Sequence, residues 1–526
     1  MVDRRAGAVA LRAAEIARAS GVTLAEDLSL WTLAGGRPSV EAVAGEPDEL
    51  GRLLESSHDE RQRQVRGAHY TGPELARALT ERALEGHAEP TVCDPACGGG
   101  ALLLAAGRAL AARGEDRAEV VRRLRGVDID PLAVATTEAA LWLWAGARPP
   151  CGHLLVADAL TDPPDWPPID VVVGNPPFLG QLARRTTRAE AYTARLRARF
   201  GDAVRAYTDT AGLFLLAGCA LARAGGTVSM VQPQSVAAAR DAAGVRAVVA
   251  ASARVRDLWV PEGRPFRAAV QVCVVTLDVG GPPAPANGWG AHLARAMGAP
   301  PVELGDGPTV HVEGPVGAAF RAEYYGTVPH VREQEDLPAG RPLLTSGLVD
   351  LGRSAWGERP ARVGGARWER PVVDEAALEG RAADWARRTN GPKLVMATQS
   401  RVVEAAPDID GHFLPGVPLV VAWPSPERLW LVAAVLCSPP VTAWIAARCA
   451  GTGLSAHALR LSAGLVREVP LPPDADAWRE GTVALETGDL DGFAAAMTAA
   501  YGCEDSVAAW WRERCGSAWS PRGPAG

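Results

Sequence analysis

Lysine is almost absent from this chain of 526 residues. Lys393 is the single lysine among 54 basic residues, so the other 53 are arginine. A P-loop needs a lysine directly after its glycines to reach nucleotide phosphates, but Lys393 follows Gly391-Pro392. A nuclease core of the Glu-x-Lys type needs an acid two residues before its lysine, where this chain has Gly391. The composition therefore excludes a standard ATP-driven motor and a common nuclease core.

Signals for disulfides, bound metal and membrane insertion are also scarce. The nine cysteines form no CxxC pair and have no zinc-ligand spacing with the nine histidines, so reduced, packed thiols are expected. Arg12 and Glu15 interrupt any apolar leader segment. Residues 429–447 carry no charge, but Pro439-Pro440 breaks this run into two short core helices. We therefore expect a soluble, cytoplasmic protein without a membrane partner.

The pattern of apolar residues changes along the chain and predicts five segments. Short apolar strands alternate with alanine-rich helices in the second segment, which predicts an α/β fold with a doubly wound, Rossmann-like parallel sheet. Its expected strands are residues 91–93, 125–127, 154–156, 170–173, 227–231 and 270–277. The predicted segments are an N-terminal helical segment (1–65), the α/β domain (66–280), a Gly/Pro-rich linker (281–319), a mixed α+β domain (320–473) and a helical tail (474–526).

Acidic residues follow the first three expected strands. Asp94, Asp128 and Asp158 lie where the carboxyl ends of parallel strands meet. A glycine loop after the first acid lets the backbone approach a ligand, the second acid suits ribose hydroxyls, and the third suits an adenine amino group. Each acid alone could cap a helix, but together they predict a nucleotide-like cofactor site. The predicted cofactor contacts here are Asp94, Pro95, Ala96, Gly98, Gly100, Asp128, Ile129, Asp158 and Ala159.

The fourth strand is followed by Asn175-Pro176-Pro177-Phe178, which contains one of only three asparagines. Two prolines fix an extended turn and remove two N–H donors. The Asn175 side-chain oxygen and the Pro176 carbonyl are then paired acceptors for an amino group, and Phe178 offers a flat surface to a planar ring. A rigid turn at a strand end is the alternative interpretation.

The order of these motifs resembles that of adenine-specific DNA methyltransferases that use S-adenosylmethionine, in particular gamma-class and type II-like modification enzymes. The resemblance implies further cofactor contacts at Tyr70, Thr71 and Phe214, and a Phe266 that stacks on a flipped adenine. The chain departs from the family pattern at Gly99, where a serine is usual, and at Gly72, which stands before the expected proline.

The resemblance implies methyl transfer to the exocyclic amino group of a flipped adenine, in restriction-modification or phage defence. Double-stranded DNA is the expected partner, with a separate restriction endonuclease or defence subunit as a further candidate. Because the net charge is −7, arginines must be clustered to bind phosphates. Arg184, Arg185 and Arg188 after the catalytic motif are candidate DNA contacts, as is Lys393 in the 320–473 domain, although the arginines also fit a solvated helix face.

Two alternative functions fit the same motif. Methyltransferases that modify a protein glutamine or a ribosomal guanine amino group also have Asn-Pro-Pro and an aromatic residue, but they are generally shorter. A catalytically inactive, DNA-binding specificity subunit would also carry a large C-terminal domain. The intact segment from Asn175 to Phe178 argues against this second alternative.

Overall fold

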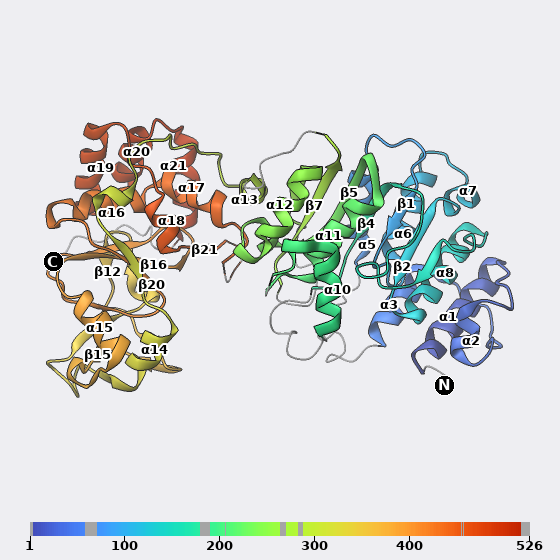
Figure 1. The fold of residues 1–526 in the computed structure, drawn as a ribbon, viewed down its shortest axis with the longest axis horizontal. Coiled ribbons are helices and arrows are strands. Elements are labelled where there is room, and N and C mark those ends of the chain that lie inside the picture. Colours follow the sequence, from blue (N-terminus) through green and yellow to red (C-terminus); the bar gives the residue numbers. More distant parts are fainter. Residues whose placement is uncertain are drawn as a thin grey trace. The chain divides into compact units, whose positions relative to one another are not determined.

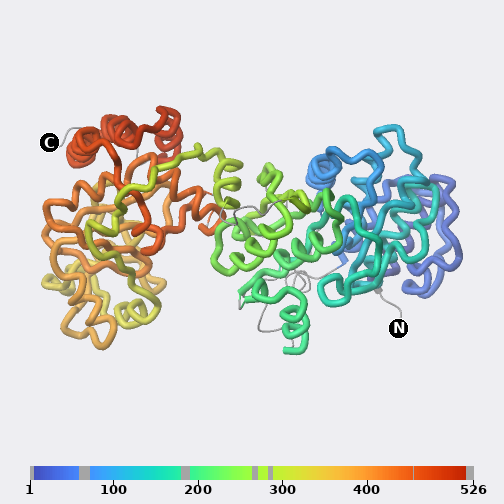
Figure 2. The backbone as a smooth tube through the Cα atoms, turned by 45° about the horizontal axis from the view of Figure 1, so that its top comes forward, coloured from blue at the N-terminus to red at the C-terminus, as the bar shows by residue number. Residues whose placement is uncertain are grey.

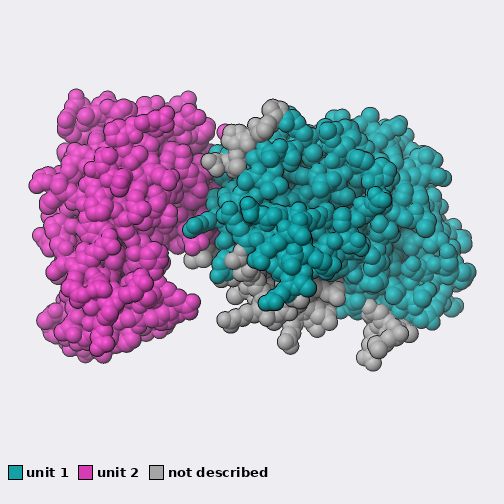
Figure 3. Space-filling view, viewed as in Figure 1, with its two compact units in different colours: residues 1–293 teal, residues 294–526 magenta. Residues whose placement is uncertain are grey.

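The computed structural model describes residues 4–57, 71–178, 190–205, 207–263, 270–281, 288–453, 455 and 457–516. The chain divides into two compact units, residues 1–293 and 294–526 (Figure 3). The division falls inside the segment 281–319 that the sequence marks as a linker, although helix α13 (Trp289–Ala296) and strand β8 (Val316–Ala318) also lie in that segment. The finer division into five segments stays a prediction.

Unit 1 is built on a seven-stranded sheet with the order β3-β2-β1-β4-β5-β7-β6 (Figure 1). The first five strands in this order are parallel, while β7 is antiparallel to both of its neighbours. The strands are β1 (Val92–Asp94), β2 (Leu124–Asp128), β3 (Leu154–Val156), β4 (Ile169–Gly174), β5 (Ala222–Pro233), β6 (Ala253–Trp259) and β7 (Val272–Val279). This α/β architecture confirms the predicted Rossmann-like sheet.

Helices cover both faces of this sheet because alternate residues of its buried strands point in opposite directions. Val171 and Val173 of β4 join the core formed with the N-terminal helices, whereas Val172 faces Gly218 on the other side. The described helices of unit 1 that follow residue 57 are α5 (Pro73–Ala83), α6 (Ala101–Ala111), α7 (Arg117–Val121), α8 (Pro131–Ala145), α10 (Glu190–Phe200), α11 (Thr210–Leu221) and α12 (Ala243–Ser252), and the boundary between the units falls within α13.

The N-terminal helices share one hydrophobic core with the sheet domain. They are α1 (Arg4–Ser20), α2 (Ser29–Ala34) and α3 (Asp48–Ser56), and they pack against α8 (Figure 2). Leu24, Leu28, Leu30 and Leu50 are fully buried in this core. The N-terminal helical segment is therefore part of the structural support of the α/β domain.

Unit 2 is a mixed α+β structure, as predicted. It contains two four-stranded sheets, with the orders β19-β10-β15-β9 and β18-β16-β20-β8, and three two-stranded sheets. The strands other than β8 are β9 (Val331–Glu333), β10 (Arg341–Leu344), β11 (Val349–Asp350), β12 (Arg353–Ser354), β13 (Ala361–Val363), β14 (Ala366–Trp368), β15 (Pro371–Val373), β16 (Lys393–Ala397), β17 (Gln399–Ser400), β18 (Ala405–Asp408), β19 (Leu414–Pro415), β20 (Leu419–Ala422) and β21 (Leu459–Arg460). The helices are α14 (Arg321–Thr327), α15 (Gly380–Arg388), α16 (Leu429–Cys437), α17 (Pro439–Cys449), α18 (Ala463–Arg467), α19 (Ala475–Thr487), α20 (Leu490–Ala500) and α21 (Asp505–Cys515).

The uncharged run at 429–447 forms two helices, α16 and α17, as the sequence predicts. Ser438 ends the first helix, and its side-chain oxygen caps the second by accepting a hydrogen bond from the Val441 N–H. No single helix among the described residues is long and apolar enough to cross a membrane. The two helices pass that test only as a pair bent by 59°, by length and composition alone.

The structure corrects the prediction that Lys393 contacts DNA. Its side chain is fully buried and forms an ion pair with Asp408. Asp408 also accepts hydrogen bonds from the backbone N–H groups of His412 (2.8 Å) and Phe413 (3.0 Å). Burial lowers the pKa of Lys393, and the bond to Asp408 opposes that change. The single lysine is therefore a core residue that joins β16 to β18.

Asp408→Ala is expected to lower the free energy of unfolding of unit 2 by about 3–5 kcal/mol, because it leaves the buried Lys393 ammonium without a counter-ion. Chemical denaturation followed by tryptophan fluorescence measures this loss. Asp410→Ala, at an exposed position two residues away, is the matched control and should change little. A loss below about 1 kcal/mol for Asp408→Ala would contradict the assignment.

Candidate cofactor and base-binding site

The three acids predicted to bind a cofactor lie with Asn175 along one edge of the unit 1 sheet. Asp94 and Asp128 are the last residues of β1 and β2, and Asp158 and Asn175 follow the ends of β3 and β4. These four strands are adjacent and parallel, in the order β3-β2-β1-β4. Their carboxyl ends therefore bring three carboxyl groups and one amide to the same edge, where open α/β sheets bind ligands.

The glycine loop is bonded to the second acid. Gly98 and Gly100 have φ angles of 51° and 85°, which only glycine adopts without strain. The Gly98 N–H donates a hydrogen bond of 2.9 Å to Asp128 Oδ2, and the Asp130 N–H donates one of 2.8 Å to Asp128 Oδ1. Ile129, between these acids, is 67% exposed, which is unusual for a large apolar side chain at a strand end.

Gly99 is in direct contact with the N-terminal helices. A Cβ atom at this position would lie 2.5 Å from the Cα of Gly51 in α3, so no larger residue fits without a backbone shift. This contact explains why a glycine stands at position 99. Arg5 of α1 also reaches the site, because its Nη1 lies 3.1 Å from Asp130 Oδ2. The N-terminal helices thus support both the glycine loop and the turn after β2.

Asp94 is the most buried acid of the site, with 2% of its surface exposed. Burial raises the pKa of its carboxyl group to about 7, and the negative charge of Asp128 adds to the rise. The backbone N–H of Ala96 donates a hydrogen bond of 3.0 Å to Asp94 Oδ1, which opposes this change. A cationic group beside this carboxyl group would stabilise its ionised form and lower its pKa.

This pKa predicts how stability depends on pH. Folded Asp94 keeps its proton up to about pH 7, whereas the ordinary value is 3.8. The folded state binds the proton more tightly, so the contribution of Asp94 to stability falls as the pH rises from about 4 to 7. Without ligand, Asp94→Asn should therefore raise the free energy of unfolding by on the order of 2–3 kcal/mol more at pH 8 than at pH 5. Equal effects in denaturation experiments at both pH values would contradict this.

The turn after β3 is held by a residue from α10. Asp158 Oδ1 accepts a hydrogen bond from the Leu160 N–H (3.0 Å), and Asp158 Oδ2 accepts one from Thr161 Oγ1 (3.0 Å). Arg199 of α10 donates hydrogen bonds to the carbonyl oxygens of Ala159 (2.6 Å) and Leu160 (2.8 Å). Ala159 is itself buried. Arg199 therefore holds this turn through its backbone carbonyl groups.

The side chain of Asn175 is oriented by Thr71. Asn175 Nδ2 donates a hydrogen bond of 3.0 Å to Thr71 Oγ1, and Thr71 is 6% exposed, just before α5. Because Oδ1 and Nδ2 lie on opposite sides of Cγ, this bond sets the direction of Oδ1 as well. Pro176 is buried, while Pro177 and Phe178 are half-buried, and Phe178 packs against the core of unit 1. The sequence predicts only a cofactor contact for Thr71. It gives no sign of the bond to Asn175, because the two residues are 104 positions apart.

The remaining predicted residues are placed as follows. Phe214 is 7% exposed in α11, and the Asp209 side chain caps the start of that helix. Pro95 is buried next to Asp94. Tyr70, Arg184, Arg185, Arg188 and Phe266 lie outside the described residues, so the structure gives no position for them.

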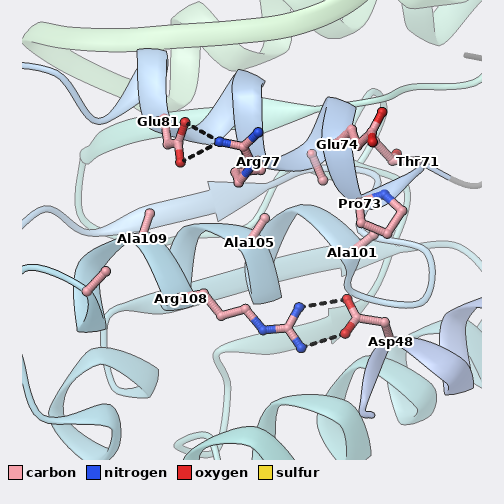
Figure 4. Close-up of a pocket in the computed structure, with 12 residues that line it drawn as sticks. Asp48, Thr71, Pro73, Glu74, Arg77, Glu81, Ala101, Ala105, Arg108 and Ala109 are labelled. Carbon is pink, nitrogen blue, oxygen red and sulfur yellow. Dashed lines mark hydrogen bonds and ion pairs between the residues drawn. The ribbon is translucent and has the colours of Figure 1, made fainter.

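A separate cavity of about 360 Å³ lies between α5 and α6 (Figure 4). Ala101, Ala105 and Ala109 line it from α6, and an ion pair between Arg108 and Asp48 crosses from α6 to α3. Of the predicted site residues that the structure describes, Thr71 alone is in its lining. The cavity is therefore distinct from the edge that carries Asp94, Asp128 and Asp158.

The nine cysteines are free thiols, of which six are buried and Cys151 is exposed. No group of three or more His, Cys, Asp and Glu residues in the described part of the chain could hold a metal ion.

Part of the chain, including this site, matches a known family model. Residues 48–247 match the family model described as N-6 DNA Methylase. A search of curated proteins found no match to the sequence.

Similarity to solved structures extends over both units. The chain is 14% identical to the type IIL restriction-modification enzyme MmeI, solved in complex with DNA, with a TM-score of 0.55 over 94% of this chain and 81% of that one. It is 12% identical to the type IIG restriction endonuclease BpuSI (TM-score 0.45, 97% and 78%). It is 20% identical to a type I restriction-modification methyltransferase subunit from Streptococcus thermophilus (TM-score 0.33, 44% and 49%). The similarity to MmeI shows a shared fold.

Proposed function

We propose that this chain, whose residues 48–247 match the family model described as N-6 DNA Methylase, transfers a methyl group from S-adenosylmethionine to the exocyclic amino nitrogen of adenine in double-stranded DNA. The observation that carries the proposal is the Asn175 amide, which is held by Thr71 at the sheet edge that also carries Asp94, Asp128 and Asp158. An amide acceptor beside three acids suits an amino-group substrate and a cofactor that is both cationic and nucleoside-like.

The residues at this edge fit S-adenosylmethionine. Asp94 is a buried acid whose ionised form is favoured by a positive charge, which the ammonium and sulfonium groups of this cofactor carry. Asp128, already bonded to the glycine loop, is assigned to the ribose hydroxyls, and the exposed Ile129 to the adenine face. Asp158 is assigned to the adenine amino group. When bound, the cofactor supplies an electrophilic methyl group.

The substrate nitrogen needs activation, because its lone pair is delocalised into the adenine ring. Asn175 Oδ1 and the Pro176 carbonyl accept the two N–H groups of the amine and so concentrate the lone pair on nitrogen. Pro176 and Pro177 have no N–H of their own to compete for these acceptors. With the cofactor held by Asp94, Asp128 and Asp158, this nitrogen would accept its methyl group as the sulfur–methyl bond breaks; S-adenosylhomocysteine would be the leaving group, and the extra proton of the amine would pass to water. Positioning and electrostatic stabilisation account for the rate.

The target base must leave the duplex to reach Asn175, as is general for enzymes that modify bases. Phe178 follows the acceptors directly, and stacking of its ring on the base would offset part of the unstacking cost. Phe266 is the second proposed stacking residue. We place this reaction in the cytoplasm, in restriction-modification or phage defence. A separate restriction endonuclease or defence subunit is the proposed protein partner, because the chain has no lysine-dependent nuclease motif.

A transfer assay with S-adenosylmethionine labelled in the methyl group tests the proposal. The acceptors are unmodified genomic duplex DNA, a poly(dG)·poly(dC) duplex without adenine, ribosomal RNA and a release-factor protein. We expect label only in the first acceptor, recovered as N6-methyladenine after digestion. Label in RNA or in a protein glutamine would show instead one of the other amino-group methyltransferases. No transfer to any acceptor would favour an inactive specificity subunit.

A further inference from the structure

A two-stranded hairpin in unit 2 projects arginines that no part of the proposed catalytic site uses. Strands β13 and β14 pair with Ala361 opposite Trp368, Arg362 opposite Arg367, and Val363 opposite Ala366. Gly364 and Gly365 connect them with φ angles of 61° and 82°. Two successive positive φ angles are typical of a tight two-residue turn that keeps both strands in register. We call residues 361–368 the arginine ribbon.

The ribbon has one packed face and one exposed face. Ala361 and Val363 are 3% and 7% exposed and belong to the core of unit 2, and Trp368 Nε1 donates a hydrogen bond of 3.2 Å to the Val363 carbonyl. Because side chains alternate along a strand, Arg362 and Arg367 point to the opposite face. Both are exposed, as are the two glycines at the tip. The packed face anchors the ribbon, so the exposed face is presented in a defined orientation.

The two arginines lie opposite each other on neighbouring strands, where like charges repel. Arg367 forms an ion pair of 3.1 Å with Glu369, but both side chains are about two-thirds exposed and the pair is screened by solvent. Arg362 makes no ion pair within the part of the chain that the structure describes. An anionic partner would relieve this repulsion.

Exposed aromatic side chains adjoin the ribbon. The Gly364 N–H donates a hydrogen bond of 3.1 Å to the hydroxyl of Tyr324, which lies in α14. In the same helix Tyr325 is 59% exposed, and the Arg321 guanidinium lies 5.3 Å from the centre of its ring. Phe320 is 64% exposed just before the helix. Exposed arginines gathered on one face are the electrostatic footprint of a nucleic-acid-binding surface, and exposed aromatic rings offer surfaces on which bases can stack.

We propose that the arginine ribbon enters the major groove of duplex DNA, where Arg362 and Arg367 contact base edges and so help to determine the methylated sequence. The major groove admits a two-stranded β-ribbon, and arginine binds the O6 and N7 atoms of guanine with two hydrogen bonds. The glycine tip has no side chains to obstruct a close approach. This inference rests on the proposed function, because it names the surface through which the enzyme selects its substrate.

Arg362→Ala, Arg367→Ala and the double variant, each in the full chain, test the proposal. Each substitution should lower kcat/KM on genomic duplex about 10- to 100-fold, as expected for loss of a bidentate base contact. Each should also relax the methylated motif at one or two positions when the modified DNA is sequenced. Affinity for S-adenosylmethionine and the thermal midpoint should not change. Arg479→Ala is the matched control, because Arg479 of α19 is equally exposed and also pairs with a neighbouring acid, Asp476.

Duplex binding is measured in parallel by fluorescence anisotropy at several salt concentrations. If the arginines contact only phosphates, the variants should bind duplexes of every sequence with equally reduced affinity, and the methylated motif should not change. The salt dependence of binding should then become shallower by about one ion per arginine. That result, or wild-type binding by the double variant, would overturn the proposal. A wild-type chain that binds duplex through the ribbon but transfers no methyl group would instead refute the proposed function alone.

Discussion

Asn175→Ala is expected to lower kcat for adenine methylation by at least about 100- to 1000-fold, the range found when one preorganised polar contact to a reacting group is removed. The alanine side chain cannot accept an N–H of the target amine, so the nitrogen lone pair stays delocalised. Affinity for S-adenosylmethionine should stay within about threefold of wild type, because the three acids assigned to the cofactor, Asp94, Asp128 and Asp158, lie at the ends of β1, β2 and β3. Single-turnover methylation and calorimetric cofactor binding separate these two effects.

A second asparagine provides the control for this experiment. Asn390→Ala removes an exposed side chain from unit 2 and should leave kcat unchanged. An Asn175→Ala enzyme that retains more than about a tenth of wild-type turnover would contradict the assigned role. Loss of cofactor binding in the same variant would show that Asn175 supports the fold of the edge instead.

Thr71→Val is expected to lower kcat about 10- to 100-fold, while KM for DNA and affinity for the cofactor change little. Valine has nearly the same shape as threonine but cannot accept the hydrogen bond from Asn175 Nδ2, which measures 3.0 Å in the structure. The amide N–H then loses its partner in a largely buried place, and the orientation of Oδ1 toward the substrate is no longer fixed. A small displacement of a reacting group can lower kcat by a factor of this size.

Thr71→Ser keeps the hydroxyl group but lacks the methyl group, and it should retain most of the activity. If Thr71 acted only through packing of its methyl group, serine would not retain activity. Thr80→Val is the matched control, because Thr80 is fully buried in the adjoining helix α5 and bonds only to that helix's own backbone. Equal damage from valine and serine at position 71 would contradict the positioning role. A selective loss of cofactor affinity would show instead that Thr71 contacts the cofactor, as the sequence predicts.

The arrangement of the site could be predicted from the sequence because it depends on which residues directly follow each strand. Acids and Asn175 follow successive strands, and parallel strands bring their ends to one edge whatever the intervening helices contain. Strand β6 was not predicted, since Arg254, Arg256 and Asp257 give its sequence a polar character. An edge strand with one exposed face shows only an alternation of apolar and polar residues. This alternation is the sequence pattern from which β6 could have been predicted.

The features that could not be predicted all depend on contacts between distant residues. Lys393 follows a Gly-Pro pair that is typical of an exposed turn, yet strand pairing places it opposite Asp408 in the core. Gly99 of the glycine loop is constrained by Gly51 of helix α3, and Thr71 binds a side chain 104 residues away. A single sequence carries no record of such pairs, because it shows which residues are present and not which of them meet.

Sequencing that detects N6-methyladenine, applied to the genome of a host expressing this chain, tests the central claim most directly. The host must lack other adenine methyltransferases, and a second culture expresses Asn175→Ala at the same level. We predict methylation at nearly every copy of one short motif with the wild-type chain and none with the variant. Absence of N6-methyladenine in the wild-type culture, or the same methylation in both cultures, would contradict the account.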